Sequence, residues 1–216
     1  MSSDEKEKRE RILAGAEGMF LEHGYAKVTM EEIASSLGIS KKTLYKFFPN
    51  KEKLVRDLIS DRQCEFMNHI DGIWRRDDLD FIGKFRITLD YFGERSSRVN
   101  RFHDLQKLVP DVWKDIHSFK KEKGLEKIKQ VLNDGFETGI LRKDINRDVI
   151  VLLYTNAVES IITPDVLAEL PFSGPQVFEA ISKIIFEGIL TEDGRKRYCS
   201  YSLPQDKKID KSVLQD

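Results

Sequence analysis

Apolar residues recur with helical spacing along most of the chain. Between residues 6 and 23 they fall on one face of a helix, because residues three and four apart lie on the same side. The positions on this face are Ile12, Leu13, Ala16, Met19 and Phe20. Further stripes of the same kind cover residues 51–76, 81–93, 111–141, 147–163 and 175–190. Runs of alternating β-branched residues are scarce, so the pattern predicts an all-α fold.

Three helix starts follow one another closely after the first helix. Each has an N-cap residue whose side-chain oxygen can accept a hydrogen bond from a first-turn N–H, and these residues are Thr29, Ser40 and Asn50. Glu32 would complete a capping box with Thr29. The spacing therefore predicts short helices at about 30–37 and 41–47, and a longer helix from Lys51.

A glycine-containing turn, Leu37-Gly38-Ile39, joins the two short helices. Two short helices joined in this way are typical of a helix-turn-helix, whose second helix enters the DNA major groove. The positions that must be apolar for the two helices to pack are Ile33, Ala34, Leu37, Ile39, Leu44 and Phe47, and all of them are. The other residues of the second helix are polar or can form hydrogen bonds. Its core-facing and DNA-facing sides therefore separate cleanly.

Charge is balanced overall but concentrated locally. The chain has 36 Lys and Arg against 37 Asp and Glu, a formal net charge of −1. The segment Ser40–Leu54 nevertheless holds five lysines and one glutamate. Net charge is a poor guide to nucleic-acid binding where charges segregate along the chain. The local excess of positive charge is therefore the better evidence. A solvated helix face would give the same charge, but on the open side of a helix-turn-helix we expect contact with DNA.

The run TMEEIASSLGISKKTLYKFFPNKEKL, residues 29–54, resembles the DNA-binding domain of the tetracycline-repressor (TetR) family of bacterial transcription regulators. The shared features are a helix that begins with threonine and contains Ile-Ala, then Leu-Gly-Ile-Ser, Thr-Leu-Tyr, an aromatic pair and Asn-Lys-Glu-x-Leu. The preceding helix, ending in Phe-Leu-Glu-His-Gly-Tyr, is similar as well. The resemblance covers roughly residues 8–56. Lys42 departs from it, because many members have a small residue there, and we expect this to affect operator choice.

The resemblance implies a transcriptional regulator and not an enzyme. It implies a homodimer that binds a palindromic double-stranded DNA operator, acts as a repressor and responds to a small-molecule effector. No nucleophile–base pair, paired-carboxylate site, phosphate loop or metal cluster indicates catalysis. One alternative stays open, namely a helical small-molecule-binding module of the same fold without specific DNA readout. Such a module would keep promoter binding after loss of Lys41 and Lys42.

The DNA contacts that we expect lie on the open face of the second short helix and at the starts of its neighbours. They are Thr29, Ser40, Lys41, Lys42, Thr43, Tyr45, Lys46 and Lys51. Lys41 and Lys42 lie in the first turn, which points into the groove, and can donate to base edges such as guanine O6 and N7. By resemblance Tyr45 contacts a phosphate, and the helix starts at Thr29 and Lys51 can hold phosphates through N–H groups. Thr29 and Ser40 could equally be N-caps alone.

The organisation we expect has three parts: a helix-turn-helix domain (1–50), a helical effector-binding and dimerisation domain (51–191) and a polar, loosely packed tail (192–216). The resemblance implies about nine helices in the second part. It also implies a homodimer formed through about 147–163 and 175–190. Both segments carry apolar residues around much of their circumference, more than a single buried face requires.

An effector pocket is implied by the same resemblance, between helices within residues 80–165. Its candidate lining residues are Phe85, Phe102, His103, Trp113, His117 and Asn156. An aromatic residue at helical spacing is more often part of the core than of a ligand wall, so core packing is the competing interpretation. No residue identifies the ligand.

Nothing in the sequence indicates a cofactor, a metal site or a membrane segment. The histidines form no HExxH pair, and Cys64 and Cys199 lie far apart, so we expect free thiols. No apolar run approaches the ~18 residues that span a bilayer, and the N-terminus lacks the apolar core of a signal peptide. We therefore expect a cytoplasmic protein.

Overall fold

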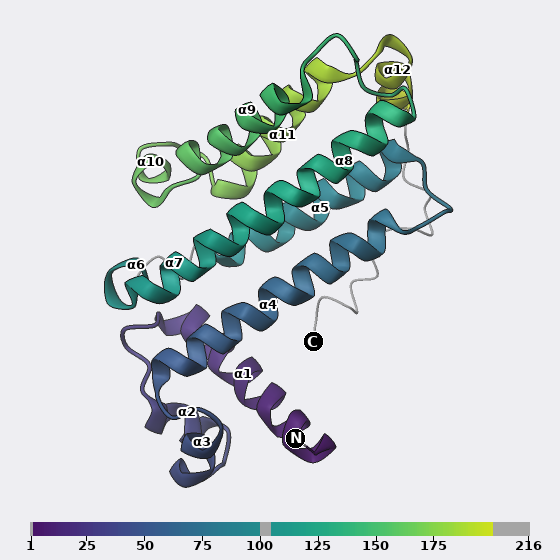
Figure 1. Cartoon of the computed structure of the whole chain (residues 1–216). Helices are drawn as coiled ribbons and strands as arrows, with labels where there is room; N and C mark the ends of the chain where they lie inside the picture. The colour runs from purple at the N-terminus through teal and green to yellow at the C-terminus, as the bar shows by residue number, and fades with distance from the viewer. Residues whose placement is uncertain (1, 100–104, 201–216) are drawn as a thin grey trace. The chain divides into compact units, whose positions relative to one another are not determined.

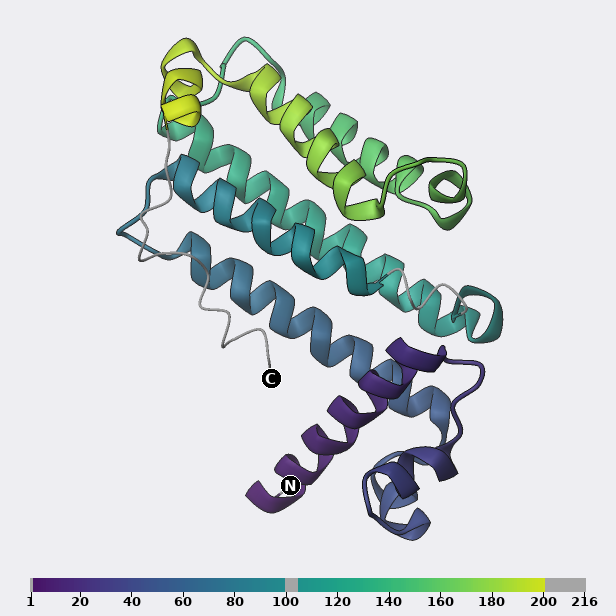
Figure 2. The ribbon, with the colours of Figure 1, turned by 180° about the vertical axis from the view of Figure 1, so that it is seen from behind.

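The structure, a computed structural model, describes residues 2–99 and 105–200. Its elements (Figures 1 and 2) are α1 (Ser3–His23), α2 (Met30–Ser36), α3 (Lys41–Phe47), α4 (Lys51–Trp74), α5 (Phe81–Val99), α6 (Leu105–Leu108), α7 (Pro110–Phe119), the π-helical turn η2 (Lys120–Gly124), α8 (Leu125–Glu137), α9 (Arg147–Ile161), α10 (Pro164–Ala168), α11 (Gly174–Ile189) and α12 (Glu192–Ser200). In these residues β-structure is limited to an isolated bridge between Leu141 and Leu190. The all-α prediction is confirmed, and nine α-helices follow α3 in the part described.

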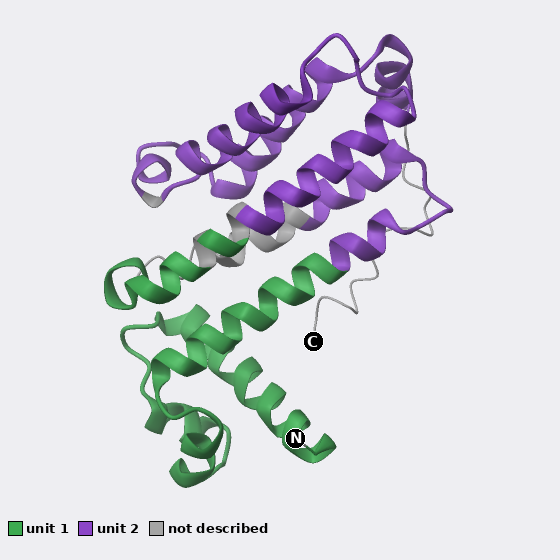
Figure 3. Cartoon of the chain, in the orientation of Figure 1, with its two compact units in different colours: residues 1–68, 98–121 green, residues 69–97, 122–216 purple. Residues whose placement is uncertain are grey.

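The chain divides into two compact units, coloured separately in Figure 3. Unit 1 comprises residues 1–68 and 98–121, and unit 2 comprises residues 69–97 and 122–216. The divisions fall inside α4, α5 and η2, so these elements contribute to both units. The boundary after residue 50 that we expect between a DNA-binding and an effector-binding domain stays a prediction.

In unit 1, the first four helices share one hydrophobic core with α6 and α7. The stripe predicted on α1 is buried there except for Met19, which is half-buried, and Phe20 and Ala16 are fully enclosed. The same cluster includes Leu105 of α6, Val109 between α6 and α7, and Val112 of α7, and Leu105 is fully buried. Residues from much later in the chain therefore support the helices that precede residue 50.

Unit 2 contains a stack of aromatic rings. The ring centroids of Phe85 and Phe186 lie 3.5 Å apart, and those of Phe81 and Phe186 lie 6.0 Å apart, with the rings close to parallel. Helices α9 and α11 run side by side in both views (Figures 1 and 2). The hydroxyl oxygens of Tyr154 on α9 and the buried Ser182 on α11 are 3.1 Å apart. These two helices are therefore joined by a hydrogen bond as well as by apolar packing.

The expectation of a loosely packed tail from residue 192 is wrong for its first nine residues. Glu192–Ser200 form α12, and the hydroxyl of Thr191 accepts a hydrogen bond from the N–H of Gly194 (3.1 Å) at its start. Tyr198 is buried, and its ring packs edge-on against Phe186 with 5.5 Å between centroids. The polar composition hid this helix because its buried residues are a glycine and a tyrosine, Gly194 and Tyr198, which form no apolar stripe. The rest of the expected tail lies outside the described residues.

Candidate DNA-binding interface

Helices α2 and α3 begin at capped positions, as the sequence predicts. The hydroxyl of Thr29 accepts a hydrogen bond from the N–H of Glu32 (3.2 Å), and the Glu32 carboxylate accepts one from the N–H of Thr29 (2.8 Å). The hydroxyl of Ser40 accepts one from the N–H of Thr43 (3.0 Å). The N-cap predictions are confirmed, and both hydroxyls already have a partner within the protein.

The turn between α2 and α3 depends on Gly38. Its φ is 66°, in the left-handed region that glycine adopts without a Cβ clash. The N–H of Ile39 then donates to the carbonyl of Ala34 (3.0 Å), which closes the turn. From α1, the guanidinium of Arg11 donates to the carbonyl of Leu37 (2.9 Å). The direction of α3 is therefore fixed both by the turn itself and by α1.

The buried side of α3 anchors it in the core of unit 1. Leu44 and the following Phe48 are fully buried, while Phe47 is half-buried against the same cluster. On α1, the guanidinium of Arg9 lies 5.8 Å from the centroid of the Phe48 ring and pairs with Asp61 of α4 at 2.6 Å. These contacts join α1, α3 and α4, and they leave the other side of α3 in solvent.

The opposite side of α3 is open and basic. Its exposed side chains are Lys41, Lys42, Tyr45 and Lys46, which together we call the α3 face. Thr43 is half-buried, with its hydroxyl 2.8 Å from that of Ser40. Four of the eight residues expected to contact DNA thus share one exposed surface, flanked by the caps at Ser40 and Thr29.

Two acidic residues lie against the α3 face. The ammonium of Lys41 is 3.2 Å from the carboxylate of Glu31 on α2, and that of Lys46 is 3.0 Å from Glu5 on α1. The hydrogen bond from Lys46 is the main cause of the lowered pKa of Glu5. The pKa of Glu31 is also lowered, mainly by a hydrogen bond from its own N–H and next by the one from Lys41. Sequence reasoning missed both acids. Glu5 stands 41 residues before Lys46, so no short-range pattern relates them.

Lys51 has an intramolecular contact that the sequence did not predict. Its ammonium donates to the carbonyl of Tyr25 and lies 4.1 Å from the centroid of the Tyr25 ring. Beside it Asn50 caps α4, as predicted, by accepting a hydrogen bond from the N–H of Lys53 (2.7 Å). The half-buried Lys51 therefore ties the start of α4 to the connection between α1 and α2. A contact of Lys51 with phosphate stays a prediction.

The residues expected to line an effector pocket belong to different surroundings. Phe85 packs against the core of unit 2, and Trp113 packs against the core of unit 1. Asn156 is exposed on α9, where its amide donates to the carbonyl of Leu152 (2.7 Å). The structure does not describe Phe102, His103 or the side chain of His117. Their role as ligand contacts stays a prediction.

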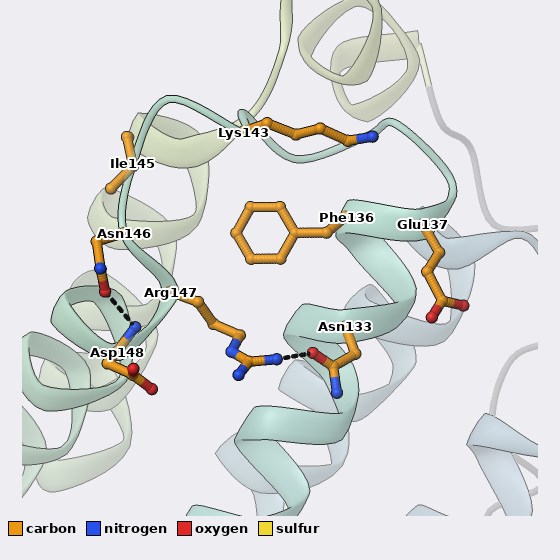
Figure 4. Close-up of a pocket in the computed structure, with 8 residues that line it drawn as sticks. All are labelled: Asn133, Phe136, Glu137, Lys143, Ile145, Asn146, Arg147 and Asp148. Carbon is orange, nitrogen blue, oxygen red and sulfur yellow. Dashed lines mark hydrogen bonds between the residues drawn. The ribbon is translucent and has the colours of Figure 1, made fainter.

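A pocket of about 470 Å³ lies between the end of α8 and the start of α9 (Figure 4). Its lining residues are Asn133, Phe136, Glu137, Lys143, Ile145, Asn146, Arg147 and Asp148. Arg147 donates to the side-chain oxygen of Asn133, and Asn146 accepts a hydrogen bond from the N–H of Asp148 (2.8 Å). Most of this lining is polar or charged, whereas ligand pockets are mostly apolar. The effector candidates that the structure describes, Phe85, Trp113 and Asn156, do not line this pocket, and we do not assign an effector to it.

A second pocket, of about 590 Å³, lies at the junction of α11 and α12. Its lining residues are Arg142, Leu190, Thr191, Glu192 and Arg195. The guanidinium of Arg142 pairs with Asp144 at 2.6 Å, and that of Arg195 donates to the carbonyl of Glu187 (3.0 Å). The arginines that line it therefore already have partners in the protein.

Comparison with known proteins agrees with this arrangement. Residues 12–58 match the sequence profile described as bacterial regulatory proteins, tetR family. YvaF of Bacillus subtilis strain 168, an HTH-type transcriptional regulator, is 25% identical over 185 residues, which cover 85% of this chain and 96% of YvaF. The chain carries the DNA-binding domain of the TetR family. Regulators with this domain bind DNA through the helix-turn-helix, here α2 and α3, and the family is not enzymatic.

Two further relatives extend the likeness of this TetR-family protein. The HTH-type transcriptional repressor KstR2 of Mycolicibacterium smegmatis is 25% identical over 154 residues, which cover 66% of this chain and 72% of KstR2. The crystal structure of a transcriptional regulator from Cytophaga hutchinsonii aligns with a TM-score of 0.68 at 23% identity, over 85% of this chain and 99% of that one. The likeness to the Cytophaga hutchinsonii structure shows that the fold shared with it extends well beyond the helix-turn-helix.

Residues 2–99 and 105–200 contain neither a cluster of metal-binding side chains nor a helix that could span a membrane. Cys64 and Cys199 are exposed free thiols, as predicted.

Proposed function

We propose that this TetR-family protein is a ligand-responsive repressor that binds a palindromic operator as a homodimer. The observation that carries the proposal is the α3 face, a basic and exposed helix surface whose reverse side is locked into the core through Leu44. A rigid helix with two exposed lysines in its first turn has the form needed to read the major groove. The KstR2 relative, which is named a repressor, supports repression over activation.

On DNA, the residues of the interface divide into two roles. Lys41 and Lys42 reach base edges, since they occupy the first turn of the reading helix. The residues that hold backbone phosphates are Thr29, Ser40, Thr43, Tyr45, Lys46 and Lys51. The hydroxyls of Thr29 and Ser40 serve as helix caps at the same time. Phosphate contacts fix the register of the helix in the groove, and the base contacts supply the sequence preference.

A homodimer formed through α9 and α11 accounts for apolar side chains that the single chain exposes. These are Val149, Leu152 and Leu153 on α9, with 57, 64 and 58% of each exposed, and Ile184 on α11 with 72%. Large apolar side chains exposed on two neighbouring helices favour a protein interface there. Affinity requires the second copy as well, because one helix with ~3–4 phosphate contacts binds weakly at physiological salt.

Response to an effector would act through the core that α6 and α7 share with the first four helices. Leu105, Val109 and Val112 are buried among residues of α1 and α4, and Asp115 of α7 pairs with Arg56 of α4. A ligand that favours a different position of α6 and α7 would therefore disturb the support of the DNA-reading helices. The ligand would shift the population toward a dimer that no longer matches its half-sites.

The decisive experiment is selection of genomic fragments by the purified protein. We expect a palindrome whose half-sites lie about one helical turn, or a multiple of it, apart. Lys41→Ala with Lys42→Ala should abolish the selection, whereas Lys53→Ala, which pairs with Asp57 on α4, should keep it. Selection of the same fragments by the double variant would reject specific readout through α3. It would favour instead a small-molecule-binding module of the same fold.

Ligand response and repression need separate tests on the selected operator. Compounds that raise the melting temperature of the protein should lower its affinity for the operator. Equal affinity of the free and ligand-bound protein would reject the proposed response. A reporter gene placed behind the operator should be silenced by the protein, and its activation would show the opposite regulatory sign.

A further inference from the structure

We propose that Glu5 and Glu31 compete with DNA for the lysines of the α3 face and thereby set the affinity of the regulator for DNA of any sequence. The inference rests on the proposed function, in which Lys41 and Lys46 contact DNA. It adds two residues outside α3 whose effect on binding is opposite in sign to that of the lysines.

The two acids come from different helices and each engages a different lysine. Glu31 of α2 pairs with Lys41 near the start of α3, and Glu5 of α1 pairs with Lys46 in its last turn. Both pairs are open to solvent, with 65% of Lys41 and 68% of Lys46 exposed. Either lysine can therefore leave its carboxylate by rotation of its own side chain.

Neither acid is required for the helix on which it stands. The capping box of α2 is formed by Glu32 and not by Glu31. Glu5 does belong to the capping box of α1 with Ser2, but glutamine serves that position as well as glutamate. Exposed ion pairs of this kind contribute little to stability. The principal effect of the two carboxylates therefore falls on what the lysines can bind.

A phosphate that approaches the α3 face meets a carboxylate already seated on the lysine. Contact with DNA requires each ammonium to exchange this partner for a phosphate or a base edge, and the displaced carboxylate stays close to the DNA. Both effects oppose binding. From the measured range for exposed pairs we expect removal of one carboxylate to tighten binding about 1.5- to 5-fold per protomer, or about 2- to 25-fold for a dimer.

The experiment uses Glu5→Gln, Glu31→Gln and the double variant of the full chain. Glutamine removes the charge, keeps the side-chain size and preserves the capping box of α1. The matched control is Glu22→Gln, an exposed acid of α1 whose ion-pair partner is His23 at 3.9 Å. The probe is a DNA duplex of mixed sequence, titrated by fluorescence anisotropy at several salt concentrations. Melting curves of each variant check that the fold is intact.

We expect each of the first two variants to bind the duplex more tightly than wild type, and the double variant to bind most tightly. The log–log salt slope should become steeper by up to about 0.9 per removed charge per protomer, because the lysines then replace more counterions on the DNA. Glu22→Gln should change the affinity much less. An equal gain from Glu22→Gln would show a general effect of net charge and would overturn the proposal.

A double-mutant cycle tests whether Glu5 acts through Lys46. The gain from Glu5→Gln should be smaller in a Lys46→Gln background, since the competition is gone and only the repulsion between the carboxylate and the DNA is left to relieve. A gain of equal size in both backgrounds would overturn the proposal, and so would weaker binding by Glu5→Gln, which would mean that Glu5 positions Lys46 for DNA. Absence of duplex binding by wild type at low salt would overturn the proposed function. Unchanged affinity of the variants beside intact wild-type binding would overturn this inference alone.

Discussion

The carbonyl oxygen of Ile140 lies 2.6 Å from the position that a Cβ on Gly194 would occupy. This carbonyl also accepts a hydrogen bond from the N–H of Thr191 (2.9 Å), so it cannot move away freely. A backbone oxygen at this distance excludes every side chain. Helix α12 therefore packs against the segment that follows α8 at a separation that glycine alone permits.

Gly194→Ala should destabilise the protein because the added methyl group cannot be accommodated. We expect a loss of about 1–3 kcal/mol in the free energy of unfolding, and a fall of roughly 3–10 °C in melting temperature. The control is Gly72→Ala in α4, where a Cβ would meet no atom within 4 Å. That change should stabilise the helix by up to about 1 kcal/mol. Circular dichroism melts of both variants measure the difference, and equal melting temperatures would contradict the packing described.

The parts of the interface that could be predicted from the sequence are those fixed by neighbouring residues. The caps at Thr29 and Ser40 use hydrogen bonds that span three residues, and the turn needs one glycine at Gly38. The buried positions Ile33 and Leu44 follow from helical spacing alone. Local geometry therefore sets the boundaries of α2 and α3 and the side of α3 that faces solvent.

The features that could not be predicted join residues far apart in the chain. The pair of Glu5 with Lys46 depends on how α1 crosses α3, and the burial of Leu105 depends on how α6 meets the first four helices. The contact of Lys51 with Tyr25 has the same origin. Each needs the tertiary arrangement, which a stripe of apolar residues does not specify.

Gly38→Ala should weaken both stability and DNA binding. Alanine in the left-handed conformation costs about 1 kcal/mol, and relief of that strain would turn α3 away from its present direction. Gly38→Asn should lose less, since asparagine tolerates this conformation better. Gly18→Ala in α1, where nothing lies within 4 Å of a Cβ, should not destabilise. Chemical denaturation and duplex binding give the two readouts, and a fully stable Gly38→Ala protein would contradict the role of this turn.

Charged substitutions on α9 and α11 should dissociate the proposed homodimer. Leu152→Glu combined with Ile184→Glu places carboxylates in an apolar interface, where they would be desolvated without partners. The protein should sediment as a monomer, and its DNA affinity should fall sharply. Leu108→Glu alters a residue that is 50% exposed on α6 and should leave the oligomeric state unchanged. A double variant that still sediments as a dimer would show that the interface lies elsewhere.

Salt dependence should report the number of phosphate contacts. A dimer that neutralises about 6–8 phosphates should give a log–log slope of about −5 to −7. Lys46→Ala removes one contact per protomer and should make the slope shallower by about 1.8. Lys53→Ala should leave it unchanged because Lys53 stands on α4, outside the α3 face, and pairs there with Asp57. Equal slopes for wild type and Lys46→Ala would remove Lys46 from the phosphate contacts.

Alkaline pH should weaken the contact between α9 and α11 through Tyr154. Burial raises the pKa of Tyr154 to about 12 from 10.0, while its hydrogen bond with Ser182 acts in the opposite direction. The folded-state pKa lies above the unfolded one, so the contribution of this group is complete below pH 10. It is lost as pH rises from 10.0 through about 12.

Tyr154→Phe separates this titration from the rest of the protein. At neutral pH the variant should be less stable by about 1 kcal/mol, because the hydrogen bond with Ser182 is gone. Between pH 10 and 12 wild type should lose stability faster than the variant, so the difference shrinks and then reverses. Ser182→Ala removes the hydrogen bond but keeps the phenol, and should retain the alkaline loss. Denaturant titrations at each pH measure these differences, and parallel curves for wild type and Tyr154→Phe would mean that the phenol ionises alike in the folded and unfolded chain.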